Sequence, residues 1–390
     1  MKKASWTLIL LTAVFLFTAC AGGQGKDGVG NSSSPVSENT AVSENTAQPP
    51  AATPADEPEE KEEAESETTV GMAVTAANPV SLHTAGEDID SSTLAHLTDD
   101  ESAPVVYFTA DISADALVRI YDTLDWNPAG KVAVKISTGE SARSNHLSPA
   151  LIEPLVTKVN GTIVECMTAY GGNRAEIAKA KQAAEDHGYT AIAPFDLMDE
   201  EGETEIPVSD GSRLDHIIVG SHTANYDRFL ILSHFKGHSM AGFGGAIKNV
   251  GIGMSSKAGK VLVHSAGTRT TGGIMYKDQD AWLEALAEMV KGMDDYLGEG
   301  GMVYVSVMNR LSVDCDCDGN PAEPDMHDIG ILASADPVAL DQACVDFIYA
   351  APDGQSVQKR IERQNGTHTL EHAEEIGLGS RAYRLVSIDD

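Results

Sequence analysis

The residues best suited to chemistry are concentrated in one glycine-rich stretch, Ser233–Gly253, which holds two histidines four residues apart. Imidazole can bind a metal or transfer a proton. A lysine can bind an anion or, where burial lowers its pKa, act as a nucleophile, and Lys248 is our candidate for a catalytic role. A mobile surface loop with solvated histidines is the alternative. The residues that we expect to contact a cofactor are His234, Lys236, His238, Gly244, Gly245, Lys248 and Asn249.

This stretch follows an apolar run, Phe229–Leu232, that predicts a short buried strand. In open α/β sheets ligands bind beyond the carboxyl ends of the strands, where glycines let the backbone approach them closely. A connection of roughly 20 residues is usually functional or disordered. The interleaved Phe235, Met240 and Phe243 are not typical of disorder. We therefore expect a glycine-rich ligand loop at the strand ends.

A second candidate element is Cys315-Asp316-Cys317, which has a further aspartate on each side. Two thiolates one residue apart can ligate a soft or borderline metal together with imidazoles. The expected cofactor is a divalent transition metal or a metal-containing molecule. The predicted metal ligands are His238, His264, Cys315 and Cys317.

Other roles for these two cysteines remain open at this point. An exported protein meets an oxidising setting, so they can form a disulfide with each other, or with Cys166 or Cys344. They can also be buried apolar side chains, with the aspartates forming a turn.

Strand and helix signals alternate along the chain from about residue 104, which predicts an α/β fold with a mostly parallel sheet flanked by helices. Ser148 followed by Pro149 is a typical helix start. His264 ends an apolar run, Lys260–Val263, that we interpret as another strand end. The other expected strands are 105–108, 131–136, 162–165, 302–307 and 383–388, and the other expected helices are 173–187, 280–297, 337–349, 355–364 and 370–376.

The first 20 residues have the pattern of an export signal. Two lysines precede an apolar run, Leu8–Phe17, that is too short to cross a bilayer. The residues Phe17-Thr18-Ala19-Cys20 resemble the lipobox of bacterial lipoproteins, in which the cysteine carries the lipid. We expect an exported protein anchored to the extracytoplasmic face of a membrane through a lipid on Cys20.

Residues 21–103 are expected to be a disordered acidic tether, because they are rich in Ser, Thr, Pro and Glu and lack the apolar residues that a core needs. The less polar part, residues 71–101, is left open as a candidate for a peripheral strand or helix. The hexapeptide Val-Ser-Glu-Asn-Thr-Ala occurs twice in tandem from residue 36. Residues 104–390 are expected to form a single α/β domain. The formal charge of the sequence is −32, which argues against nucleic acid as a partner because phosphates would be repelled.

Several motifs in order along the chain are similar to those of the domain of unknown function 362 family. The matching segments are residues 134–140, 233–238, 242–249, 315–317, 328–334 and 336–341. Gly259-Lys260 and His264 also match and lie between the third and fourth of these segments. Many members carry a ferredoxin-like insertion with Cys-x-x-Cys spacing after the position of His264. This chain has residues 266–280 there without a cysteine, so an iron–sulfur cluster of that kind is not expected.

A more distant likeness is to the nickel-pincer lactate racemases. Their glycine loop, with a histidine before it, a lysine at its end and a second histidine further on, looks like His238, Lys248 and His264 here. In that family the lysine is tethered to a nicotinate-derived cofactor and the later histidine binds nickel. The resemblance implies that Lys248 and His264 face one cofactor or metal site.

The sequence thus predicts an exported lipoprotein whose α/β domain binds a metal or cofactor, with redox or isomerase-type chemistry. The alternative is a non-catalytic surface lipoprotein that binds a small anionic ligand or a metal in the same loop.

Overall fold

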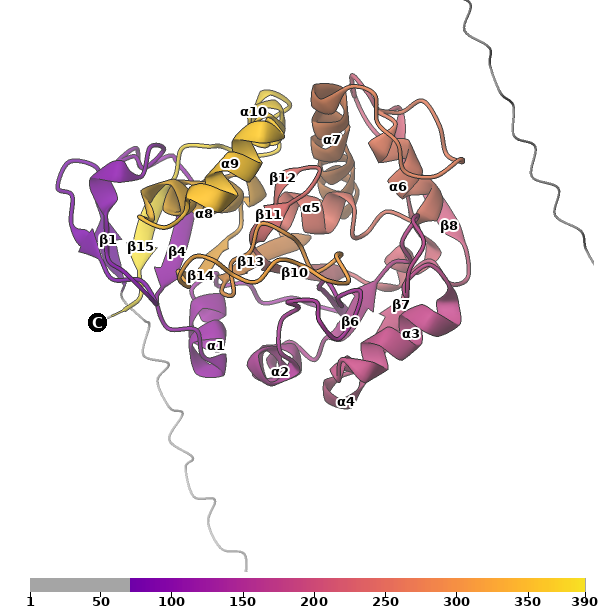
Figure 1. Cartoon of the computed structure of the whole chain (residues 1–390), viewed down its shortest axis with the longest axis horizontal. Coiled ribbons are helices and arrows are strands. Elements are labelled where there is room, and N and C mark those ends of the chain that lie inside the picture. The colour runs from indigo at the N-terminus through magenta and orange to yellow at the C-terminus, as the bar shows by residue number, and fades with distance from the viewer. Residues whose placement is uncertain (1–70, 390) are drawn as a thin grey trace, which may run out of the picture. The chain divides into compact units, whose positions relative to one another are not determined.

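The computed structural model describes residues 71–389, which belong to one compact unit built around a nine-stranded sheet (Figure 1). The strand order is β1-β15-β4-β14-β13-β10-β5-β6-β7. Their bounds are β1 Met72–Val74, β4 Val105–Thr109, β5 Val132–Lys135, β6 Thr162–Glu165, β7 Phe195–Leu197, β10 Arg228–His234, β13 Met302–Met308, β14 Gly330–Ser334 and β15 Arg384–Ser387.

The sheet is mixed but mostly parallel. β13, β10, β5, β6 and β7 run parallel to one another, as do β15 and β4. β14 is antiparallel to both of its neighbours, and the edge strand β1 is antiparallel to β15. The predicted α/β class with a mostly parallel sheet is confirmed. Parallel strands need crossover connections, and these supply the helices on the two faces.

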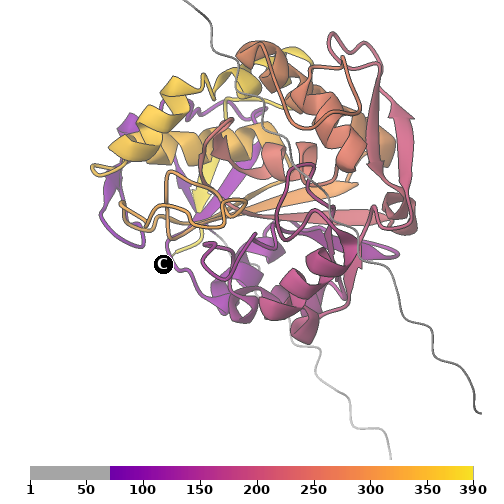
Figure 2. The same cartoon turned by 45° about the vertical axis from the view of Figure 1, so that its right-hand side comes forward.

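Alternating residues of the central strands point to opposite faces, and each face has its own apolar cluster. Val132 and Val134 of β5 pack in one cluster with side chains of α1 and α2, whereas Ala133 packs in the other with side chains of α5, α7 and α8. Figure 2 shows these two helical layers on either side of the sheet. The helices are α1 Ala114–Asp122, α2 Pro149–Lys158, α3 Ile177–Asp186, α4 Tyr189–Ile192, α5 Ala246–Gly251, α6 Lys257–His264, α7 Gln279–Leu297, α8 Pro337–Ala350, α9 Gln355–Arg363 and α10 His368–Glu375.

Small additional pairs of strands flank the main sheet. They are β2 Ser81–Leu82 with β3 Ile89–Asp90, β8 Glu203–Pro207 with β9 His216–Gly220, and β11 Lys236–His238 with β12 Gly242–Gly244. Short 3₁₀ turns follow β3 at Ser91–Thr93 and β9 at Ser221–Asn225. No helix in the described part of the chain is both long and apolar enough to cross a membrane.

The ordered structure begins earlier than residue 104, the expected boundary. β1 is the edge strand of the main sheet, and Val74, Leu82, Ile89 and Leu94 are buried in the larger apolar cluster. Residues 71–103 therefore belong to the fold rather than to the tether, and β1 is the peripheral strand that the sequence leaves open for residues 71–101. This segment has few apolar side chains, but they pack against the core that the rest of the chain forms. The predicted signal, the lipid-bearing Cys20 and most of the tether lie outside the described residues.

Two further local expectations need correction. Residues 260–264 lie in helix α6, which begins at Lys257 behind the cap Ser256, rather than at the end of a strand. The glycine-rich stretch is not one long loop but the hairpin β11–β12 followed by α5. A Cβ on Gly237 would lie 2.5 Å from the backbone of Val313, so only glycine permits this packing of the hairpin.

Candidate functional site

A cavity of about 640 Å³ opens at the carboxyl ends of β5, β6 and β10. The structure brings together around it every residue that the sequence singled out for a site, although their roles remain predictions. These residues are His234, Lys236, His238, Gly244, Gly245, Lys248, Asn249, His264, Cys315 and Cys317. His234 ends β10, and the hairpin β11–β12 followed by α5 carries the residues from Lys236 to Asn249. His264 ends α6, and the loop between β13 and β14 carries the two cysteines.

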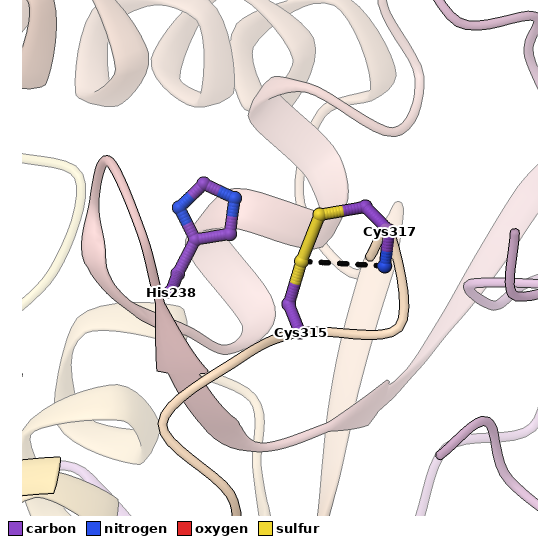
Figure 3. Close-up of side chains that lie close together, drawn as sticks. All are labelled: His238, Cys315 and Cys317. Carbon is purple, nitrogen blue, oxygen red and sulfur yellow. Dashed lines mark hydrogen bonds between the residues drawn. A yellow bond between two sulfur atoms is a disulfide. The ribbon is translucent and has the colours of Figure 1, made fainter. Parts of the chain in front are cut away.

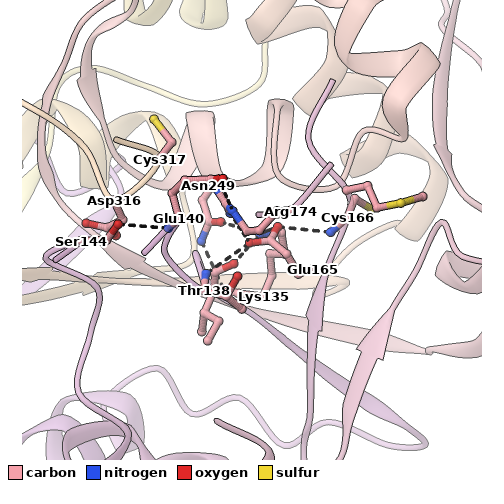
Figure 4. Close-up of polar contacts among 12 residues, drawn as sticks. Lys135, Thr138, Glu140, Ser144, Glu165, Cys166, Arg174, Asn249, Asp316 and Cys317 are labelled. Atoms are coloured by element: carbon pink, nitrogen blue, oxygen red, sulfur yellow. Dashed lines mark hydrogen bonds and ion pairs between the residues drawn. The ribbon is translucent and has the colours of Figure 1, made fainter. Parts of the chain in front are cut away.

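The floor of the cavity is a buried network of ion pairs (Figure 4). Nζ of Lys135, at the end of β5, lies 2.9 Å from Oε1 of Glu165, at the end of β6. Arg174 contacts the carboxylates of Glu165 at 3.2 Å and Glu140 at 3.1 Å. Burial raises the pKa of Glu165, but Lys135 and Arg174 together bring it below its usual value, so this carboxyl is ionised. Lys135 and Arg174 are not among the site residues that the sequence predicted.

The side chain of Asn249 is mostly engaged with other protein groups. Its side-chain oxygen accepts from Nζ of Lys135 at 3.0 Å, and its amide nitrogen donates to the carbonyls of Lys135 and Leu232. It thus ties α5 to β5 and β10 and orients Lys135. Asn249 also lines the cavity, so its predicted cofactor contact stays a prediction beside this positioning role.

Asp316, between the two cysteines, is held by two side chains from the opposite wall, His234 and Lys236. Nδ1 of His234 lies 2.9 Å from one carboxylate oxygen and Nζ of Lys236 lies 2.6 Å from the other. Burial alone would raise the pKa of Asp316, but Lys236 and His234 hold it far below its usual range. Nε2 of His234 also faces the carbonyl of Asn309 at 2.6 Å, so neither ring nitrogen is free for a metal. His234 and Lys236 therefore position the cysteine loop.

Lys248 is different, because it is half-buried against the cavity and its amine makes no ion pair in the described part of the chain. Burial lowers its pKa from 10.5 to about 7, and the nearby cations Lys236, Arg174 and Lys135 contribute to this shift. About half of the amines are therefore neutral at pH 7. A neutral amine is nucleophilic, and the same amine, when protonated, attracts an anion.

The helix that carries Lys248 depends on Asp341 of α8. This buried carboxylate accepts from the backbone N–H groups of Ala246 at 2.7 Å and Ile247 at 2.9 Å. A Cβ on Gly245 would lie 2.2 Å from Asp341 Oδ1, so glycine is required there. The N–H groups of Ala246 and Ile247 are thus already occupied and do not bind a ligand.

The two histidines beside Lys248 have opposite tautomers. Nδ1 of His238 accepts from the backbone N–H groups of Ala241 at 2.9 Å and Met240 at 3.2 Å, so the proton of the neutral ring is on Nε2. Nδ1 of His264 instead donates to the carbonyl of Lys260 at 2.6 Å, which leaves the lone pair on Nε2 free.

Both of these rings are neutral at pH 7. Burial and the charge of Lys248 lower the pKa of His238 well below its usual value. Burial lowers the pKa of His264 to about 4, and Lys248 adds to this effect. A metal-binding histidine usually donates its other N–H to an oxygen, and His264 has this arrangement whereas His238 does not.

Cys315 and Cys317 form a disulfide with each other, and Cys166 and Cys344 are free and buried. Donor atoms of His238, Cys315 and Cys317 lie within 4.8 Å of one another (Figure 3). Disulfide sulfurs are not thiolates, so in this state they do not supply the metal ligands that we predicted. Of the four predicted metal ligands, only His264 keeps a free donor atom.

A second group of possible metal donors, outside the cavity, is Asp196, Glu200 and His222. His222 pairs through Nδ1 with Asp196 at 2.8 Å and through Nε2 with Glu201 at 3.3 Å, and Lys181 pairs with Glu200. The group is therefore satisfied by its own ion pairs.

A family model described as domain of unknown function (DUF362) matches residues 132–346, more than half of the chain. The protein belongs to this family. No curated protein sequence matches the chain.

Two solved structures are similar to this chain. The lactate racemase apoprotein from Thermoanaerobacterium thermosaccharolyticum is 13% identical, with a TM-score of 0.38 over 70% of this chain and 63% of that one. A crystal structure of a protein from Thermotoga maritima is 10% identical, with a TM-score of 0.36 over 67% of this chain and 58% of that one. The chain thus spans less than two thirds of the length of either.

We expect Asp316→Ala to lower the free energy of unfolding by about 3–5 kcal/mol, because it leaves Lys236 and His234 buried without their anion. Urea denaturation followed by fluorescence measures this change. Asp318→Ala in the same loop is the matched control, since that side chain is exposed and contacts only the backbone of Asn320. Equal losses in the two variants would show that the ion pairs do not hold the loop.

Proposed function

We propose that the cavity binds an anionic small molecule or a metal-containing cofactor, which Lys248 holds and whose metal His264 ligates. The observation that carries this proposal is the amine of Lys248. It faces a cavity lined by further cations, has no anionic partner in the described structure and is half neutral at pH 7. Holding an unpaired amine among Lys236, Arg174 and Lys135 costs stability, and an anion in the cavity would recover that cost.

The amine can act in two ways at this position. As an ammonium it attracts a carboxylate or phosphate. As a neutral amine it can attack a carbonyl carbon of the ligand with loss of water, or an acyl carbon with loss of the leaving group, and become a covalent tether. The pKa of about 7 makes both forms available near neutral pH.

His264 supports the metal part of the proposal. The carbonyl of Lys260 fixes the proton on Nδ1, and stacking on Trp282, with ring centroids 5.3 Å apart, restrains the ring. Its free Nε2 and its lowered pKa suit a metal ligand, because no proton has to be displaced at neutral pH. A transition metal bound there would supply redox or isomerase-type chemistry.

The second candidate function is binding without turnover. It is favoured by the contacts of Asn249, His234 and Lys236 with other protein groups, because these contacts hold the walls of the cavity in place. In that case the same cavity captures a small anion or a metal.

We expect Lys248 to react as an amine with a midpoint near pH 7 in competitive labelling with a trace of fluorodinitrobenzene. Burial and neighbouring cations disfavour its charged form, so its reactivity should rise between pH 6 and 8 and then level off. Free Nα-acetyl-lysine in the same tube is the reference, and peptide mass spectrometry assigns the site. A Lys248 profile that coincides with the reference would contradict the proposal.

We expect protein purified without chelator from nickel-, cobalt- and zinc-supplemented cells to carry metal that His264→Asn reduces at least tenfold. Elemental analysis of the folded protein measures it. His238→Asn is the matched control, because an amide oxygen can still accept from the hairpin amides, and it should keep the metal. Loss in His238→Asn with retention in His264→Asn would reverse the assignment, and no metal in the wild type would leave only the anion-binding function.

We also propose that the protein is an exported lipoprotein, supported by the residues before Cys20. We expect a clickable fatty-acid analogue to label the wild type and place it in the membrane fraction, whereas Cys20→Ser should be unlabelled. Equal labelling of both proteins, or none of the wild type, would remove the anchor. Partners are then a small molecule or metal in the cavity, the membrane through the lipid, and no nucleic acid.

A further inference from the structure

We propose that the Cys315–Cys317 disulfide is a redox centre, reduced reversibly by a small thiol that enters the cavity. The disulfide lies in the cavity wall, on the loop between β13 and β14. This inference stands apart from the proposed cofactor site, because it needs neither a bound metal nor the amine of Lys248.

A purely stabilising role does not suit this disulfide. The two cysteines are separated by two positions. In the chain-entropy description, a cross-link stabilises a fold by restricting the unfolded chain, and the effect grows with the loop that it closes. A loop this small restricts the unfolded chain very little. The disulfide therefore contributes little to the stability of the folded protein.

The loop is also held in place without the disulfide. The carboxylate of Asp316 binds His234 and Lys236, and its backbone carbonyl accepts from the N–H of Glu140 at 2.9 Å. The N–H of Gly237 donates to the carbonyl of Ser312 at 2.8 Å, which fixes the segment before the cysteines. Two thiols formed by reduction would thus remain next to each other, ready to be oxidised again.

Cys166 and Cys344 are neither paired with another cysteine nor accessible in this way. Cys166 also lines the cavity, but it is buried, its Sγ lies 3.4 Å from the carbonyl of Met254, and burial raises the pKa of its thiol. Cys344 is buried in α8. Cys317 is only half-buried, so an entering thiol can reach its sulfur.

One N–H group already contacts Sγ of Cys315, and a second points toward the disulfide. The backbone N–H of Cys317 donates to Sγ of Cys315 at 3.3 Å. Nδ1 of His238 accepts from two backbone amides, so its proton is on Nε2, which points toward the disulfide in Figure 3 without forming a hydrogen bond to either sulfur. Hydrogen bonds to an ionised acceptor are stronger than neutral ones, and this favours Cys315 as the leaving sulfur.

The reaction follows from this asymmetry. The thiolate of an entering small thiol attacks Sγ of Cys317 and forms a mixed disulfide, while the Cys315–Cys317 bond breaks and its electron pair stays on Cys315. A second thiol group of the reductant attacks its own sulfur in the mixed disulfide and releases Cys317. In total the reductant loses two electrons and two protons and leaves as a disulfide, and the protein gains two thiols.

The test equilibrates the native protein with graded ratios of reduced and oxidised dithiothreitol, alkylates free thiols and counts them by mass spectrometry. We expect Cys315 and Cys317 to open together and close again on dilution into the oxidised reagent, with a melting temperature changed by less than about 4 °C. Opening only in denaturant, or unfolding on reduction, would show a structural disulfide and overturn the proposal. Zn²⁺ uptake that blocks reoxidation would assign the group to metal binding and also overturn it.

Variants test the part played by His238. His238→Asn can still accept from the hairpin amides but lacks the Nε2 donor, so we expect opening by reduced dithiothreitol to slow about tenfold, the effect of one hydrogen bond to a charged atom. We also expect the slowing to persist across the pH range in which the imidazole is neutral. Cys166→Ser, the matched control in the same cavity, should open at the wild-type rate. Equal rates in His238→Asn and the wild type would exclude the proposed donor.

Discussion

The arrangement of the site depends on one buried carboxylate, Asp316, and the two side chains that hold it. His234 comes from the end of β10 and Lys236 from β11, whereas Asp316 belongs to the loop after β13. A buried charge is tolerated only with close partners, so these three side chains lock the loop against the hairpin in one position. The cysteines on either side of Asp316, and the cavity wall that they form, take their places from this contact.

The charge of the cavity contrasts with that of the whole chain. The sequence is strongly acidic, yet Lys135, Arg174, Lys236, Lys248 and Lys260 all line the cavity. Three of them are paired with carboxylates, and Lys260 donates to the carbonyl of Ser255 at 2.6 Å. An acidic surface around a cationic interior favours a small anion that fits inside over a large polyanion that must lie across the surface.

The sequence predicted the fold class and the residues around the cavity because both depend on local patterns. Apolar runs marked the central strands, and polar groups at their ends converge in any mostly parallel sheet. The roles of the individual site residues could not be predicted from the sequence. Whether His264 or His238 has a free nitrogen depends on which backbone groups their rings meet, and the run before His264 has a length at which helix and strand cannot be told apart. Asp341 and Asn249 act on segments distant in sequence, and no local pattern reports such contacts.

Contacts of long sequence separation around the cavity determine when a ligand can bind. Lys135 meets Asn249 across 114 residues of chain, and Ser141 meets the carbonyl of Gly319 across 178. Pairings of such long range form late, because the intervening chain must first be ordered. The first and last segments of the cavity are synthesised far apart in time, so a nascent chain has no partial pocket that could trap a ligand. A ligand bound in the cavity then indicates that the protein has folded. Any factor that delivers a ligand must recognise the folded protein.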